Sequence, residues 1–181
     1  MRIHRALLVA ALLLLAGMAQ ASTGLAQGDV PPDFLGRDSN GHDVHVQDLH
    51  GKVVLITFWA SWCGYCLKEL PILAGIQKLA GPAQLQVVAI SYKEDYDNFR
   101  KIHHNLRKES MLLTYDSDST ASKVFDVSGI PHILMIGRDG RIAHVHVGYD
   151  EAMLDTIVAE VNALLATPAP VPDSGHAAGG A

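Results

Sequence analysis

Cys63 and Cys66 are the only cysteines in the chain, and two residues, Gly64 and Tyr65, separate them. A disulfide between them closes a very short loop, so it removes little entropy from the unfolded chain. The pair is therefore a poor structural crosslink. Two cysteines at this spacing can instead exchange disulfides with other molecules, because a thiolate attacks a disulfide and a second thiol resolves the mixed disulfide that forms.

The segments around the pair predict how the two thiols are positioned. Residues 52–60 form a continuous run of β-branched and aromatic residues, which is typical of a buried strand. From residue 63 to residue 79, apolar residues recur at helical spacing. Cys63 therefore falls where a strand ends and a helix begins, and the unpaired N–H groups there favour a thiolate. Cys66 lies one turn deeper on the same face, where it can displace a mixed disulfide formed by Cys63.

The rest of the chain alternates between predicted strands and helices. Turn signals around short alternating pieces predict a hairpin within residues 33–50. The later segments are assigned by periodicity and by Gly- or Pro-containing turns. Strands are expected at 85–91, 111–115, 132–136 and 141–147, and helices at 95–108, 118–125 and 151–165. This order predicts an α/β fold with helices flanking a sheet, which a terminal antiparallel hairpin makes mixed.

The two ends of the chain differ in composition from this central part. Residues 1–21 combine a basic start, an apolar run and a small-residue pattern, and we expect a secretory signal peptide. An uncleaved leader would instead tether the protein to a membrane, but the apolar run is shorter than the ~20 residues of a comfortable span. Residues 167–181 are rich in Pro, Gly and Ala and predict a disordered tail. One domain is expected between them, at residues 31–166.

A signal peptide implies a periplasmic or otherwise extracytoplasmic location, where a disulfide can persist. The chain has 181 residues, a formal net charge of −5 and a sequence pI near 6.0. No basic stripe accompanies this charge, so the sequence indicates no nucleic-acid partner.

The motif itself resembles a known fold. The stretch WASWCGYCLKELP at residues 59–71, the G-I-P at 129–131 and Gly148 are similar to the thioredoxin fold. The N-terminal hairpin, the helix inserted at 95–108 and the E-x-P at 69–71 more narrowly resemble the TlpA/ResA group of extracytoplasmic thioredoxin-like proteins. The resemblance implies a thioredoxin fold with an N-terminal β-hairpin and a central helical insert.

The resemblance also implies roles for matching residues. Cys63 would be the attacking thiol and Cys66 the resolving one. Pro131 matches a cis-proline that faces the disulfide and leaves a backbone edge free for a substrate strand. Trp62 would pack beside the pair. Glu69 matches an acidic residue that tunes the thiols or handles protons, and the alternative is a solvated helix residue.

Two positions depart from the pattern of these families. Thioredoxins place a buried acid below the resolving cysteine, whereas this chain has Thr57 there. The residue after the cis-proline is commonly Thr in the TlpA/ResA group, whereas this chain has His132. A histidine beside the thiols would stabilise a thiolate when protonated, or accept a proton when neutral. The alternative is a histidine that only fills the surface.

The favoured function is thiol–disulfide exchange with cysteine-containing partner proteins. The TlpA/ResA resemblance implies a reductant, acting for example on cysteines that await haem attachment or on a copper site, and supplied by an upstream thiol electron donor. An oxidant or isomerase would work in the opposite direction. We expect no cofactor and no bound metal for this function.

Three other classes of protein remain as alternatives. A Cu(I) metallochaperone would use Cys63, Cys66 and His132 as soft and borderline ligands. Copper-delivering relatives typically space their cysteines by three residues, however, and the gap here is two. A peroxidase would carry a T-x-x-C arrangement, and Ala60 occupies the place of the Thr. A purely structural or binding domain would leave the cysteine motif unexplained.

Overall fold

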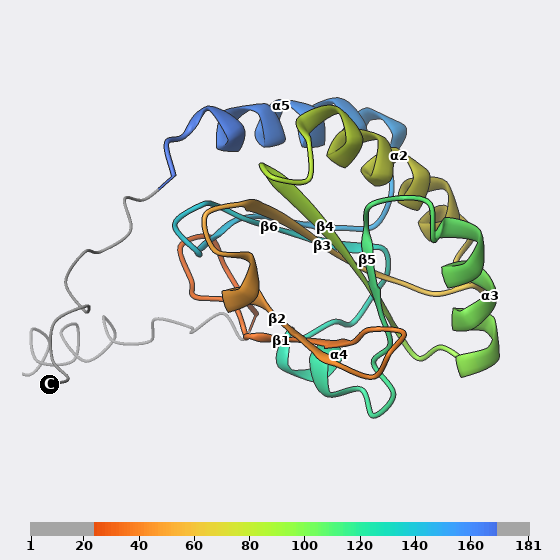
Figure 1. Cartoon of the computed structure of the whole chain (residues 1–181). Helices are drawn as coiled ribbons and strands as arrows, with labels where there is room; N and C mark the ends of the chain where they lie inside the picture. The colour runs from red at the N-terminus through yellow and green to blue at the C-terminus, as the bar shows by residue number, and fades with distance from the viewer. Residues whose placement is uncertain (1–23, 170–181) are drawn as a thin grey trace, which may run out of the picture.

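The computed structural model describes residues 24–169 (Figure 1), so the expected signal peptide and nearly all of the expected tail lie outside it. The described chain opens with an antiparallel pair of strands, β1 (Phe34–Arg37) and β2 (Asp43–His45). A 3-10 helix, η1 (Val46–Leu49), follows directly. The hairpin predicted within residues 33–50 is therefore confirmed, and it forms a separate two-stranded sheet.

A mixed five-stranded sheet lies at the centre of the molecule, in the order β5-β4-β3-β6-β7. Its strands are β3 (Val53–Trp59), β4 (Leu85–Ser91), β5 (Leu112–Thr114), β6 (His132–Ile136) and β7 (Ile142–Val147). β3, β4 and β5 run parallel to one another, whereas β6 and β7 are antiparallel to their neighbours. Every residue of β3 and β4 is buried, as their continuous apolar runs predict.

Helices and the hairpin cover the two faces of this sheet (Figure 1). On one face, α2 (Gly64–Ala80), α3 (Tyr96–Leu106) and α5 (Glu151–Ala166) contribute to a hydrophobic cluster that also contains both cysteines. On the other face, α4 (Thr120–Val124), the hairpin and η1 build a second cluster. The predicted helices and strands are all present, and most differ from the predicted bounds by one or two residues at an end.

Two of the helix starts have a clear local cause. The Asp95 carboxylate accepts the N–H groups of Asp97 and Asn98 and so caps α3. The buried Asp116 carboxylate accepts two further N–H groups, from Ala121 and Ser122, at the start of α4. Among residues 24–169, no helix has both the length and the apolar character to cross a membrane.

Candidate active site

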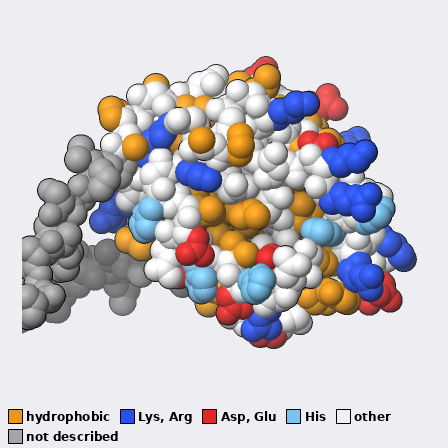
Figure 2. Space-filling model, in the orientation of Figure 1, with side chains coloured by type: hydrophobic (Ala, Val, Ile, Leu, Met, Phe, Trp, Pro, Cys, Tyr) orange, Lys and Arg blue, Asp and Glu red, His pale blue; other side chains and the backbone are white. Residues whose placement is uncertain are grey.

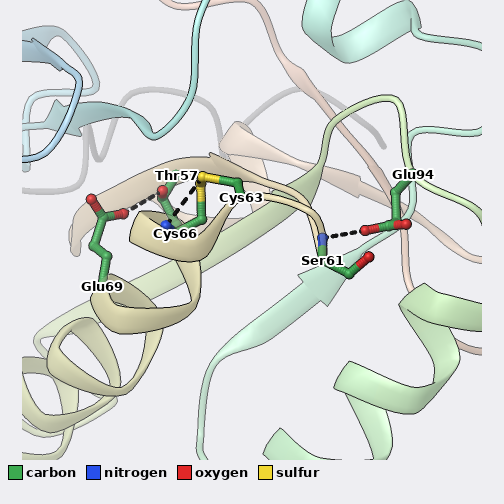
Figure 3. Close-up of a disulfide and its surroundings, with 6 residues drawn as sticks. All are labelled: Thr57, Ser61, Cys63, Cys66, Glu69 and Glu94. Carbon is green, nitrogen blue, oxygen red and sulfur yellow. Dashed lines mark hydrogen bonds between the residues drawn. A yellow bond between two sulfur atoms is a disulfide. The ribbon is translucent and has the colours of Figure 1, made fainter.

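The two cysteines form a disulfide at the first turn of α2 (Figure 3). Cys63 is the residue that caps this helix, and the N–H of Cys66 donates to its sulfur at 3.2 Å. Cys63 is 8% exposed, whereas Cys66 is completely buried. Cys63 is therefore the less buried of the two, and its thiolate would receive a backbone N–H at the positive end of a helix.

A buried carboxyl group lies on the Cys66 side of the disulfide. Glu69 follows Cys66 by three residues on α2, which places the two side chains on the same helix face. The Thr57 hydroxyl of β3 donates to the Glu69 carboxylate at 2.8 Å. Figure 3 shows Thr57 between Glu69 and the two sulfur atoms. Glu69 is only 1% exposed, so its interpretation as a solvated helix residue is wrong.

This burial sets the protonation of Glu69. Removal of the carboxylate from water raises its pKa to about 7, and the Thr57 hydrogen bond opposes part of that rise. The side chain can thus hold or release a proton near neutral pH. Position 57 lacks the acid of thioredoxins, but its hydroxyl contacts an acid that the helix supplies.

The loop before β6 contains the proline of the G-I-P motif. The peptide bond between Ile130 and Pro131 is cis, as the resemblance implies. Ile130 packs against both hydrophobic clusters, one of which contains the two cysteines. The Pro131 carbonyl accepts the Gly148 N–H at 2.8 Å, which joins this loop to the end of β7.

Trp62 lies next to the cysteines and is 61% exposed. Its indole N–H donates to the Lys93 carbonyl at 3.4 Å, and its ring packs on Tyr92 with centroids 6.5 Å apart. The N–H of Ser61 donates to the Glu94 carboxylate (Figure 3). The loop after β4 therefore holds the residues that immediately precede Cys63.

A second aromatic contact at this site, between Tyr65 and Tyr149, was not predicted from the sequence. Tyr65, between the two cysteines, stacks on Tyr149 with ring centroids 5.5 Å apart. Tyr149 directly follows Gly148, so the stack lies close to the Pro131 loop. An exposed aromatic residue inside the motif was the only available signal, and it identified no partner.

His132 does not join the thiols. It pairs with Phe58 across β6 and β3, so its side chain lies on the sheet face opposite Thr57. Its ring lies beside the Phe58 ring, with centroids 6.1 Å apart. Burial lowers the pKa of His132, whereas the negative charge of Asp126 acts in the opposite direction. It is 7% exposed, so the surface-filling alternative is also wrong. Within the described residues, its Nδ1 has no hydrogen-bond partner.

A three-ligand copper site gains no support from this arrangement. His132 lies on one face of the sheet, and the cysteines belong to the hydrophobic cluster on the other face. In the part of the chain that the structure describes, no group of three or more His, Cys, Asp or Glu residues could hold a metal ion.

The sheet topology, the disulfide at a strand-to-helix junction and the cis-proline before β6 together define a thiol–disulfide oxidoreductase with a thioredoxin fold. More particularly, the chain belongs to the Redoxin family, whose sequence profile matches residues 26–165.

Individual relatives agree with this assignment. The chain is 29% identical to thiol-disulfide oxidoreductase ResA of Bacillus subtilis, over 68% of this chain and 69% of that one. It is 34% identical to thiol:disulfide interchange protein CycY of Rhizobium leguminosarum, over 55% and 52%. A crystal structure described as thiol:disulfide interchange protein DsbE of Chlorobium tepidum superposes with a TM-score of 0.68 at 28% identity, covering 78% of this chain and 99% of that one.

Proposed function

We propose that the protein works outside the cytoplasm, where Cys63 and Cys66 reduce disulfides of partner proteins. The observation that carries the proposal is the asymmetry of the pair, because Cys63 caps α2 and keeps 8% exposure whereas Cys66 is completely buried. The reducing direction is supported by the resemblance to the TlpA/ResA group. Partner cysteines that await haem attachment, or that belong to a metal site, are the substrates that this resemblance suggests.

The exchange takes two steps. In the reduced protein, the Cys63 thiolate attacks one sulfur of the partner disulfide, a bond forms between them, and the other partner sulfur leaves as a thiolate. Cys66 then loses its proton and attacks the Cys63 sulfur, which releases the second partner thiol and leaves the Cys63–Cys66 disulfide. Two electrons pass to the partner, and an upstream thiol donor restores the reduced pair.

Glu69 is the residue that we propose accepts the proton of Cys66. Its carboxyl lies on the same helix face, and the Thr57 hydroxyl that contacts it lies toward the sulfurs (Figure 3). A buried group with a pKa of about 7 can take up this proton at neutral pH and return it when the disulfide is reduced again.

Trp62 and the Pro131 loop are the residues that we propose contact the partner. Trp62 presents an exposed ring beside Cys63. The resemblance places a strand of the partner along the backbone beside the cis-proline, so we propose that the partner pairs with this loop as its cysteine reaches Cys63. We propose no role in catalysis for His132, because its side chain lies on the other face of the sheet.

The reduction potential of the Cys63–Cys66 pair tests the direction of exchange. Equilibration with glutathione buffers, followed by thiol labelling, is expected to give a potential below about −200 mV, in the range of thioredoxins and glutaredoxins. A value near −120 mV, typical of a strong oxidant, would contradict the proposal. Copper content should be measured on the same reduced protein, since stoichiometric Cu(I) would favour the metallochaperone alternative.

The extracytoplasmic location has its own test. The basic start, the short apolar run and the small-x-small pattern of positions 19–21 predict a mature protein that begins after Ala21. N-terminal sequencing of protein recovered from the extracytoplasmic fraction is expected to show this start. A membrane-bound product that retains Met1 or Arg2 would show that the leader is an anchor.

A further inference from the structure

The outer side of α3 lines a groove of about 840 Å³ that plays no part in the exchange described above. Lys, Arg and His side chains gather over this side of the molecule in Figure 2, where Figure 1 places α3. We call this feature the α3 groove. Its lining includes Ser39, Tyr96, Asp97, Arg100, Lys101 and Arg107.

The charge of the α3 groove differs from that of the whole chain. Three cationic side chains, Arg100, Lys101 and Arg107, line it against a single carboxylate, that of Asp97. The chain as a whole has a formal net charge of −5. The groove is therefore a local cationic surface on an acidic protein, and it attracts negative charge.

The cations of the groove have no carboxylate partner among the described residues. Lys101 donates to the side-chain oxygen of Asn98 at 3.3 Å, and Arg107 contacts a ring nitrogen of His104 at 3.3 Å. Both of these partners are uncharged when the histidine is neutral. The positive charges thus remain available to another molecule.

An aromatic ring supplies an apolar contact in the same groove. Tyr96 is 48% exposed, and its ring packs on Phe99 and Tyr115 with centroids 6.3 and 5.1 Å away. The ring is therefore fixed by neighbours and still presents a surface to the groove. A concave site that combines cations with an aromatic ring fits an acidic chain segment with an apolar side chain better than a flat layer of lipid headgroups.

The α3 groove is joined to the redox site through the loop that precedes α3. Lys93 and Glu94 of this loop accept hydrogen bonds from Trp62 and Ser61, the residues just before Cys63. Asp95 then caps α3, and Tyr96 is the first residue of the helix. A molecule that extends from the groove past Tyr96 would follow this loop toward Trp62 and Ser61.

We propose that the α3 groove docks an acidic, partly apolar segment of the same protein whose disulfide Cys63 attacks, which rests on the function proposed above. The positive charges raise the rate at which such a partner meets the redox site, and the exposed Tyr96 ring holds the segment there. Salt weakens this attraction, because the cations are exposed to solvent.

Peptides with defined tails test the proposal. Each contains the same intramolecular disulfide, joined by Gly-Ser linkers of several lengths to an Asp-Glu-Leu tail, to a Lys-Leu tail or to no tail. The reduced wild-type protein is expected to reduce the acid-tailed peptide about tenfold faster than the tail-free one at low ionic strength. This gain disappears in about 1 M salt.

Charge reversal in the groove provides the decisive variant. Arg100→Glu with Lys101→Glu is expected to abolish the gain from the acidic tail and to favour the Lys-Leu tail. The milder double variant, Arg100→Gln with Lys101→Gln, is expected to abolish the rate gain from the acidic tail without creating a preference for the Lys-Leu tail. A matched reversal away from the groove, Lys52→Glu with Lys78→Glu, retains the wild-type preference. Circular dichroism establishes that each variant is folded.

The remaining outcomes separate this proposal from the proposed function. Equal rates for all tails at every linker length overturn the docking proposal, whereas failure to reduce even the tail-free peptide overturns the proposed function. If the wild-type protein instead sediments with phosphatidylglycerol vesicles through Arg100 and Lys101, and tails have no effect, the groove is a membrane contact and the proposal is wrong.

Discussion

A Cys66→Ser variant is expected to accumulate partner proteins as mixed disulfides on Cys63, whereas Cys63→Ser is expected to accumulate few or none. Cys63 is the less buried cysteine and its sulfur receives the Cys66 N–H, so we expect it to form the first bond with the partner. Without the Cys66 thiol, that bond is not resolved. Non-reducing gels of extracytoplasmic extracts measure the effect, as shifted bands that vanish on reduction.

Both variants should lose turnover, because each cysteine is needed in one of the two steps. Alkylation provides an independent measurement on the reduced wild-type protein. Mass spectrometry is expected to find Cys63 modified before Cys66, since Cys66 is completely buried. Equal trapping by the two variants, or faster labelling of Cys66, would show that the attacking cysteine has been assigned wrongly.

Glu69→Gln is expected to stabilise the oxidised protein at pH 8 by about 3 kcal/mol, with little change at pH 4. Burial raises the pKa of Glu69 from 4.5 to about 7. At pH values below 4.5 the carboxyl is protonated in both the folded and the unfolded protein, so it does not lower the free energy of unfolding. Between 4.5 and 7 only the folded state keeps the proton, and stability falls as pH rises. Above 7 the full cost of a buried charge is present.

Urea unfolding of the oxidised protein across this pH range measures the effect. The oxidised form is the suitable one, because cysteines in a disulfide do not titrate. Glu109→Gln, at an exposed position, is the matched control and should follow the wild-type curve. A Glu69→Gln curve parallel to the wild-type curve would show that Glu69 does not carry a raised pKa.

The same substitution is expected to slow exchange. If Glu69 accepts the Cys66 proton, Glu69→Gln lowers the rate of the resolving step by about 100-fold at pH 7. Rapid-quench measurement of a Cys63–glutathione mixed disulfide isolates this step. If the Glu69→Gln variant is more stable but resolves the mixed disulfide at the wild-type rate, Glu69 does not accept the Cys66 proton and the proposed role is wrong.

The local features of the site could be read from the sequence. The buried strand before Cys63 and the helix after it follow from short-range periodicity, and their junction places the pair at a helix N-terminus. The different accessibility of Cys63 and Cys66 follows from their spacing along one turn. The hairpin and the mixed sheet follow from turn signals and from the order of elements. The strands, helices and turns depend on neighbouring residues, so the sequence alone determined them, and the order of these elements indicated the class of sheet.

The chemistry around the pair depended on contacts between distant segments. Thr57 and Glu69 belong to different elements, and only the packing of α2 on β3 brings their oxygens within 2.8 Å. Periodicity shows that a helix has a buried face, but the partner of each residue on that face depends on how the helix is rotated against the sheet. Glu69 could therefore be read equally well as solvated or buried.

The contacts of His132 and Tyr65 also could not be predicted from the sequence. His132 follows the proline of the motif, which suggests proximity to the thiols, but the pairing of β6 with β3 turns its side chain to the opposite face. Because side chains alternate along a strand, a register shift of one residue would reverse that face. The Tyr65–Tyr149 stack joins residues far apart in the chain. Register and helix rotation are set by the packing of the whole core, so only the tertiary structure decided which side chains meet the disulfide.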